Sequence, residues 1–195
     1  YALNTESGQV DGFFVNGAAD GLTVGPREKL MGVRALPMHR LTLENVRVDP
    51  AQRLGGEAGI DFATILAHGR VAIGALAVGV MRAALDYAIT YAKEREQFGA
   101  PIATKQAIAF MLAECAIEID SARLMVWEAA WKLDQGADAS KEAYLAKEYA
   151  AQAALMVTDA AVQTLGGHGY IREHPVERWL RDARGFATFE CLAMV

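Results

Sequence analysis

A single carboxylate near the end of the chain stands among apolar residues. Glu190 lies between Phe186, Phe189, Leu192 and Met194, and no basic residue occurs within five positions on either side of it. A carboxylate in apolar surroundings has a raised pKa and can act as a general base near neutral pH. An exposed glutamate at a frayed terminus would have the same sequence pattern. The sequence leaves both interpretations open.

Three glycines within four residues mark a second candidate site. Residues 163–170 read Gln-Thr-Leu-Gly-Gly-His-Gly-Tyr, whereas a helix cap needs only one glycine. Glycines let a ligand approach the backbone closely, and exposed N–H groups there can hold oxyanions. The segment lacks the Gly-Lys-Ser/Thr ending of a Walker loop and does not have the G-x-G-x-x-G order. A ligand loop and an ordinary helix end both fit it.

The other charged segments of the chain are predicted to be solvated parts of helices. Residues 95–99, Arg-Glu-Gln-Phe-Gly, fit a solvated helix end in which Gly99 is the C′ residue. The four histidines lack metal-ligand spacing, so no metal site is expected. A dense charge cluster predicts a solvated helix face with i,i+4 pairs such as Glu177–Arg181. Its basic members are Arg172, Arg178, Arg181 and Arg184.

Two kinds of structure must position these residues. Gly, Pro, Asn and Asp punctuate residues 1–56 every few positions, which predicts short antiparallel strands. From Gly59 onward, apolar residues recur at spacings of three and four among good helix formers. The predicted helices are Ile60–Arg95, Thr104–Leu133, Ser140–Leu165 and Pro175–Arg184.

Long helices joined by short loops predict an antiparallel bundle. The predicted fold class is therefore α+β, mostly α. A partial antiparallel β-domain (1–56) precedes an up-down four-helix bundle (57–195), and we expect the chain to be a fragment with its last helix truncated.

The sequence also predicts details of helix packing. Gly69, Gly74 and Gly79 suggest that the first helix packs closely against a neighbour, and Ser140 is a plausible N-cap of the third. The predicted buried stripe of the second helix consists of Ile108, Met111, Leu112, Cys115, Ile119 and Leu124.

Composition narrows the class of protein. The chain has 195 residues, 53% of them hydrophobic, and a net charge of −5. This balance excludes disorder driven by low hydrophobicity and gives no general attraction to nucleic acid. Two cysteines cannot form a disulfide framework. The longest apolar run, Val71–Met81, is too short for a membrane span, so none is expected.

Five segments, taken in order, resemble the acyl-CoA dehydrogenase family. They occur at the family's spacing over essentially the whole chain. The resemblance implies the second half of a middle β-domain followed by most of a C-terminal helical bundle, with the N-terminal helical domain absent. The segments are Lys29–Arg34, Leu43–Val48, Arg95–Gly99, Gln163–Tyr170, and Pro175–Arg178 continued by Arg181–Arg184.

The resemblance implies a cofactor and the residues that bind it. FAD would lie between the β-domain and the bundle, and a neighbouring subunit of a homotetramer or dimer would contact its ADP half. A guanidinium fork and free backbone N–H groups suit a diphosphate. The implied FAD-binding residues are Arg95, Gln97, Phe98, Gln106, Gln163, Gly166 and Gly167.

The resemblance also implies a reaction. Glu190 falls at the position of the family's catalytic glutamate. It would remove the α-proton of an acyl-CoA thioester while the β-hydrogen leaves as hydride to flavin N5, giving the trans-2-enoyl-CoA. Some members carry the base immediately before the arginine that matches Arg70, but here that residue is Gly69. Arg70 and Cys191 would lie at the thioester end of the substrate, and Cys191 replaces the usual glycine, which is expected to narrow the site.

Partners and alternatives complete these expectations. An electron-transferring flavoprotein would accept the electrons, in the bacterial cytoplasm or, in a eukaryote, the mitochondrial matrix.

A related flavin oxidase, such as an acyl-CoA oxidase or a nitroalkane oxidase, is an open alternative. A non-catalytic helical interaction module is another, and Cys191 supports it.

Overall fold

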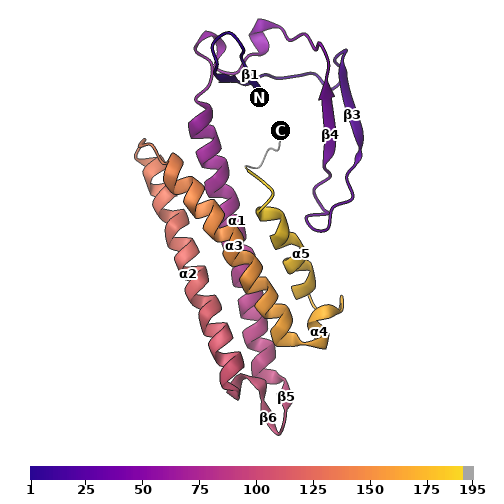
Figure 1. Ribbon diagram of the computed structural model, residues 1–195, viewed down its shortest axis with the longest axis vertical. Coiled ribbons are helices and arrows are strands. Elements are labelled where there is room, and N and C mark those ends of the chain that lie inside the picture. The colour runs from indigo at the N-terminus through magenta and orange to yellow at the C-terminus, as the bar shows by residue number, and fades with distance from the viewer. Residues whose placement is uncertain (191–195) are drawn as a thin grey trace. The chain divides into compact units, whose positions relative to one another are not determined.

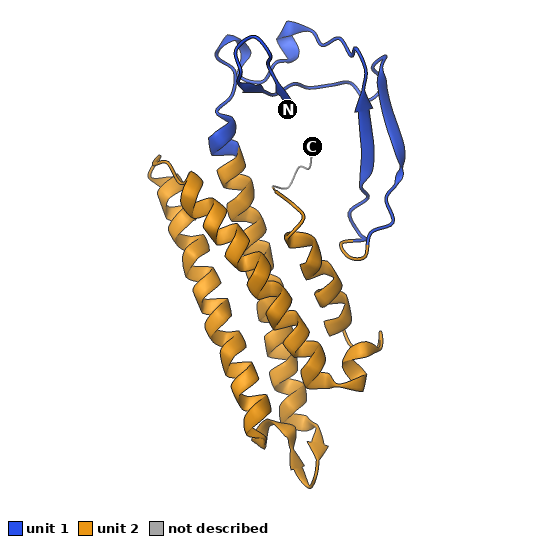
Figure 2. Ribbon diagram, viewed as in Figure 1, with its two compact units in different colours: residues 1–30, 34–65, 195 blue, residues 31–33, 66–194 orange. Residues whose placement is uncertain are grey.

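The computed structural model describes residues 1–190 and divides them into two compact units (Figure 2). Unit 1 comprises residues 1–30 and 34–65. Within the described part of the chain, unit 2 comprises residues 31–33 and everything from residue 66. The domain boundary predicted between residues 56 and 57 stays a prediction.

Unit 1 contains short antiparallel strand pairs, as the spacing of turn residues predicts. Strand β1 pairs with β2, and β3 pairs with β4. Asn45, shortly after β4, adopts a left-handed φ of 54°. The elements are β1 (Ala2–Leu3), β2 (Val10–Asp11), β3 (Leu22–Arg27), β4 (His39–Leu43), and the 3₁₀-helices η1 (Pro50–Gln52) and η2 (Gly56–Ala58).

An ion pair joins β2 to the residue that follows η1. Asp11 is buried, and its Oδ1 lies 2.8 Å from Nη2 of Arg53. The hydrogen bond from Arg53 holds the pKa of the Asp11 carboxyl below its usual range, and Asn4 adds a second hydrogen bond at 3.2 Å. A buried carboxylate needs such partners to remain charged.

Unit 2 is a helical bundle (Figure 1). Three long helices lie side by side, and the shorter α5 runs along α3. The elements are α1 (Phe62–Glu94), β5 (Glu96–Gln97), β6 (Ala100–Pro101), η3 (Ile102–Thr104), α2 (Gln106–Asp134), α3 (Ser140–Leu165), α4 (Gly167–Tyr170) and α5 (Val176–Phe186). The sequence predicts the ends of the three long helices to within two residues, and the mostly-α fold class is confirmed.

Alanine dominates the core of the bundle. The main cluster joins residues of α1, α2, α3 and α5, and its largest buried side chains include Met81 and Ile119. Cys115 is also in this core, as expected, and burial raises the pKa of its thiol to about 11. Small side chains let helix axes approach closely. Along α3 alone, buried alanines occur at positions 143, 146, 150, 151, 153, 154, 160 and 161.

Two predictions about helix packing are only partly correct. Ile73 and Gly74 of α1 are buried, and a Cβ on Gly74 would lie 2.9 Å from Cγ2 of Val126, so this glycine does permit close packing. A Cβ on Gly79 would meet nothing within 4 Å. In α2, Leu124 belongs to the predicted buried stripe but is 61% exposed.

The N-cap of α3 also differs from the prediction. Ser140 is the first helical residue and does not cap the helix with its own side chain. The N-cap residue is Ala139, and Asp138, one residue earlier, accepts a 2.9 Å hydrogen bond at its Oδ1 from the Ser140 amide. Hydrogen bonds from the side chain and backbone of Ser140 hold the pKa of Asp138 below its usual value. An acid beside a helix N-terminus is also favoured by the helix dipole.

Helix α1 is long and apolar enough to cross a membrane by length and composition alone. A core helix of a soluble protein passes the same test, and α1 packs nine buried residues into the bundle. The expected absence of a membrane span stays a prediction.

The two glycines of α1 form a matched pair for a stability test. Gly79→Ala is expected to stabilise the protein by about 0.5–1 kcal/mol, because alanine favours a helix and the position is open. Gly74→Ala brings the same propensity gain but forces Val126 to move, at a cost of about 1–3 kcal/mol. Urea unfolding of both variants measures the difference. Equal stabilisation by both changes would contradict the close contact at Gly74.

Candidate functional site

Glu190 lies after α5 and contacts cations from two other helices. Its Oε1 is hydrogen-bonded to Nη2 of Arg70 on α1, and its Oε2 lies 3.4 Å from Nζ of Lys147 on α3. The Glu190 side chain is 53% exposed, whereas Arg70 and Lys147 are 15% and 4% exposed. A partly exposed carboxylate is therefore held against two largely buried cations.

This environment corrects the expectation drawn from the apolar neighbours of Glu190 in the sequence. The hydrogen bond from Arg70 lowers the pKa of the Glu190 carboxyl, and the charges of Arg70 and Lys147 act in the same direction, against a smaller opposing effect of burial. The carboxyl is therefore ionised at neutral pH. A raised pKa, as expected for an apolar pocket, is wrong for this structure. Cys191 lies outside the described residues.

Residues 96–101 form a β-hairpin, so Gly99 is not the C′ residue of the preceding helix. Strand β5 pairs with β6, and the two residues between them, Phe98 and Gly99, have φ values of 56° and 77°. Two consecutive positive φ angles are typical of a type I′ turn, for which glycine is well suited and phenylalanine is not. Phe98 is also 92% exposed. The hairpin therefore holds a large apolar side chain in water at a conformationally costly position.

A cavity of about 430 Å³ brings the hairpin and the glycine-rich segment together. Five of the seven predicted FAD-binding residues line it: Arg95, Gln97, Gln163, Gly166 and Gly167. Phe98 and Gln106 do not line the cavity. Gln106 is the first residue of α2, and Phe98 lies at the tip of the hairpin.

The lining of this cavity suits an anionic dinucleotide. It offers a guanidinium group and two side-chain amides. Gly166 adopts a φ of 57°, and a Cβ on either Gly166 or Gly167 would meet nothing within 4 Å, so the backbone there is open to a ligand. Backbone amides and arginine are the usual partners of phosphate oxygens.

Two of the lining residues that sequence reasoning did not assign to this site, Tyr91 and His168, are joined by a hydrogen bond. The hydroxyl of Tyr91 is 2.8 Å from Nδ1 of His168. His168 stacks on His174 at a ring-centroid distance of 5.5 Å, and Tyr87 is hydrogen-bonded to His174 at 2.8 Å. The four side chains also line an adjoining cavity of about 420 Å³. The sequence could have indicated that Tyr91 lies near the site, because it stands one helical turn before Arg95.

The predicted solvated face of α5 has a further structural role. The Glu177–Arg181 pair is confirmed, with Nε to Oε2 at 2.7 Å, and it lowers the pKa of Glu177. Arg181 also donates to the Met31 carbonyl at 3.0 Å, and Asp182 accepts a 2.6 Å hydrogen bond from the Val33 amide. Residues 31–33 thus dock on α5. A Cβ on Gly32 would lie 2.0 Å from the Arg181 carbonyl oxygen, so only glycine fits there.

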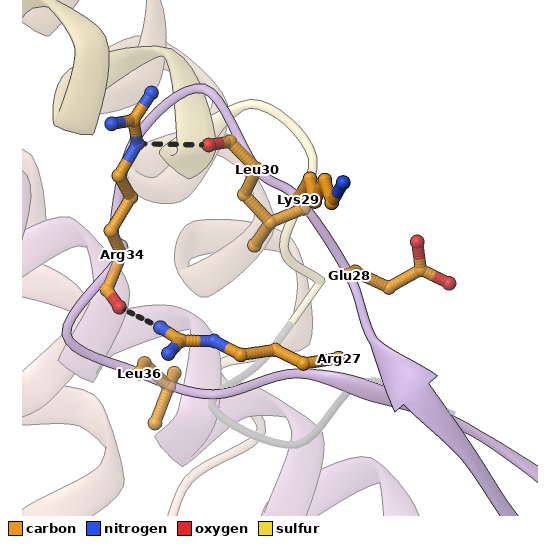
Figure 3. A pocket seen from close by; sticks show the side chains of 6 residues that line it. All are labelled: Arg27, Glu28, Lys29, Leu30, Arg34 and Leu36. Atoms are coloured by element: carbon orange, nitrogen blue, oxygen red, sulfur yellow. Dashed lines mark hydrogen bonds between the residues drawn. The ribbon is translucent and has the colours of Figure 1, made fainter.

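Unit 1 contains a basic cavity of about 650 Å³ (Figure 3). Its arginines serve the loop itself: Arg27 donates to the Arg34 carbonyl, and Arg34 Nε donates to the Leu30 carbonyl at 3.1 Å. Lys29 and Glu28 point away from these two arginines. The guanidinium groups are thus engaged with backbone carbonyls. Within residues 1–190, no group of three or more His, Cys, Asp or Glu residues is placed to hold a metal ion.

Comparisons with known proteins find matches over most of this chain. The family described as "Acyl-CoA dehydrogenase, C-terminal domain" matches residues 59–190. The probable acyl-CoA dehydrogenase FadE25 of Mycobacterium tuberculosis is 44% identical over 185 residues, which is 93% of this chain and 47% of that protein.

Solved structures share the fold over nearly the whole chain. Butyryl-CoA dehydrogenase from Megasphaera elsdenii aligns with a TM-score of 0.87 and 35% identity, over 96% of this chain and 50% of that one. PigA, solved with FAD and proline, aligns with a TM-score of 0.86 and 26% identity, over 93% of this chain and 48% of that one. The chain spans about half the length of the relatives that it matches.

Proposed function

Because the chain belongs to the acyl-CoA dehydrogenase family, we propose that it forms the base-bearing half of an FAD-dependent acyl-CoA dehydrogenase. The observation that carries this proposal is the position of Glu190 at the end of the matched domain, where its Oε1 accepts a hydrogen bond from Arg70. The substrate would be an acyl-CoA thioester and the product its trans-2-enoyl-CoA.

The proposed reaction assigns a proton to this chain. An ionised Glu190 oxygen takes the α-proton of the thioester, and the C–H electron pair becomes the new Cα–Cβ bond as the β-hydrogen departs with its own pair. Bound FAD would supply the acceptor for that hydride. Arg70 keeps Glu190 in its ionised form before the transfer, because a nearby cation favours the charged carboxylate.

The 430 Å³ cavity would bind the ADP half of FAD. Arg95 supplies the charge for the diphosphate, and the amides of Gln97 and Gln163 can orient the polar groups around it. The open backbone at Gly166 and Gly167 allows close approach. Phe98 and Gln106 would contact the cofactor from outside this cavity. PigA was solved with FAD, which supports the same cofactor for this fold.

Geometry along α1 supports assembly of this chain into a homo-oligomer. Arg70 lies near the start of α1, and Arg95 follows its last residue, Glu94. At 1.5 Å per residue, the 25 residues from Arg70 to Arg95 correspond to about 38 Å, which exceeds the length of one extended dinucleotide. The base and the ADP cavity of one chain would therefore serve two different flavins. A second copy, in a dimer or tetramer, would provide the missing half of each site.

The exposed face of α2 offers a surface for that second copy. Phe110, Ile117, Leu124 and Trp131 recur every seventh residue and are each about 60% exposed, and Trp127 is 61% exposed beside them. A heptad repeat of apolar residues is the pattern of a helix–helix seam, and exposed apolar patches mark interaction sites.

Electron-transferring flavoprotein is the proposed partner that reoxidises the flavin.

The base assignment is tested by Glu190→Gln in the purified flavin-containing protein. Bound flavin is expected to be retained, while its bleaching by acyl-CoA slows by about 10²–10⁴-fold, because glutamine accepts hydrogen bonds but cannot take the proton. Stopped-flow absorbance at the flavin bands measures the rate. Glu114→Gln, on the exposed side of α2, serves as the control. Unchanged bleaching in Glu190→Gln would exclude Glu190 as the base.

The cofactor assignment is tested by Arg95→Ala. Loss of one charge-assisted contact to the diphosphate is expected to weaken FAD binding by about ten- to a hundredfold. Flavin-fluorescence titration of the apoprotein gives the dissociation constant. Arg82→Ala, an exposed arginine of α1 paired with Asp86, is the matched control. An unchanged dissociation constant would remove Arg95 from the FAD site.

The assembly surface is tested by Leu124→Glu. A carboxylate in the apolar seam must be desolvated, so the oligomer is expected to dissociate into smaller species. Light scattering after size exclusion gives the mass, and a red shift of Trp127 and Trp131 emission reports their exposure. Leu124→Met keeps the volume and the apolar character and is expected to assemble normally. If Leu124→Glu keeps the parent mass, the second copy binds elsewhere.

A further inference from the structure

The side of α3 next to Glu190 carries a buried lysine that the proposed reaction does not use. Lys147 is 3% exposed in a bundle whose other buried residues are nearly all apolar. Burial of an ammonium group is costly unless the group is paired. Lys147 has two acidic partners, Glu148 at 2.8 Å and Glu190 at 3.4 Å. Its position therefore depends on these two carboxylates.

The two cations hold different oxygens of Glu190. Arg70 contacts Oε1 from α1, and Lys147 faces Oε2 from α3. A carboxylate held by one cation can rotate about its last side-chain bond, whereas contacts to both oxygens restrict that rotation. The clamp therefore fixes the orientation of the carboxylate as well as its charge.

Tyr144 and Glu148 lie on the same face of α3 as Lys147, and each contacts one of the two cations. Tyr144 lies beneath the guanidinium of Arg70, with Cζ 5.0 Å from the ring centroid. Lys147 follows at i+3 and Glu148 at i+4, so all three side chains project to the same side of the helix. The Glu148 side chain is more exposed than that of Lys147, and Glu148 shares the Lys147 ammonium with Glu190.

We propose that Lys147 is a positioning residue for the base, fixing Oε2 of Glu190 and favouring its ionised form, and that Glu148 moderates this effect by competing for the same ammonium. The proposal rests on the proposed function, in which Glu190 is the base. The charged groups placed against Glu190 are Arg70 from α1 and Lys147 from α3, with Glu148 behind the latter.

The proposal predicts shifts of opposite sign for two neighbouring substitutions. Lys147→Met removes a positive charge, so the pKa of Glu190 rises and the acid limb of the pH–rate profile moves to higher pH by about one unit. At a pH below that limb, flavin bleaching then slows about tenfold. Glu148→Gln removes the competitor and a negative charge, so the limb moves to lower pH. Single-turnover bleaching by acyl-CoA across pH measures both shifts.

Three further measurements separate positioning from a purely structural role. Binding of a non-oxidisable acyl-CoA thioether is expected to be unchanged in both variants, because Lys147 acts on the base and not on substrate affinity. Lys147→Arg restores the positive charge and is expected to return the limb toward its original pH. Lys141→Met, an exposed lysine at the start of the same helix, should leave the profile unchanged.

Defined outcomes would overturn the proposal. If Lys147→Met and Glu148→Gln both leave the acid limb in place while Glu190→Gln abolishes bleaching, the base assignment stands and the positioning role of Lys147 fails. If Glu190→Gln still bleaches, the proposed function fails first. If Lys147→Met does not fold, Glu148→Gln decides alone: a limb moved to lower pH supports the proposal, and an unmoved limb overturns it.

Discussion

The close packing of alanine between the long helices is the constraint on which the rest of the structure depends. Most of the buried hydrophobic residues are alanines, and along α1, α2 and α3 they face one another across the bundle. Small side chains bring helix backbones together and leave little freedom for the helices to slide. A side chain at a given position of α1 therefore stays at a fixed distance from its counterparts on α3. Fixed distances of this kind are what a site built from several helices requires.

The charged site follows from the same packing. Alanine cannot fill the space at the edge of the bundle where Glu190 approaches, and Lys147 and Arg70 occupy it with long side chains whose stems are buried. Their charges must be compensated, and Glu190 and Glu148 supply the compensation. The resulting group is polar but firmly held, because each ion lies against an opposite charge. Catalytic groups are most effective when their surroundings are preorganised in this way.

Sequence reasoning predicted the helices well because their periodicity is local. It failed at Arg95–Gly99, since an arginine and a glycine after a helical pattern fit both a C-cap and the hairpin that forms. It also misjudged the pKa of Glu190, because the neighbours along the chain are apolar while the cations that contact it come from α1 and α3. Leu124 was misplaced because α2 has apolar residues on two faces, only one of which is buried. The errors at Glu190 and Leu124 concern contacts that only the tertiary structure defines, whereas the error at Arg95–Gly99 is a local ambiguity.

The up-down connection of the helices explains why two sites exist. Helices α1 and α3 run in the same direction, and α2, which connects them in the chain, runs in the opposite direction (Figure 1). Their first turns therefore share one end of the bundle and their last turns share the other. Arg70 and Lys147, each two turns into its helix, meet at the first end, to which α5 returns Glu190. Arg95 and Gln163, each at the end of its helix, meet at the second. One topology thus places Glu190 toward one end of the bundle and the cavity lined by Arg95 and Gln163 toward the other.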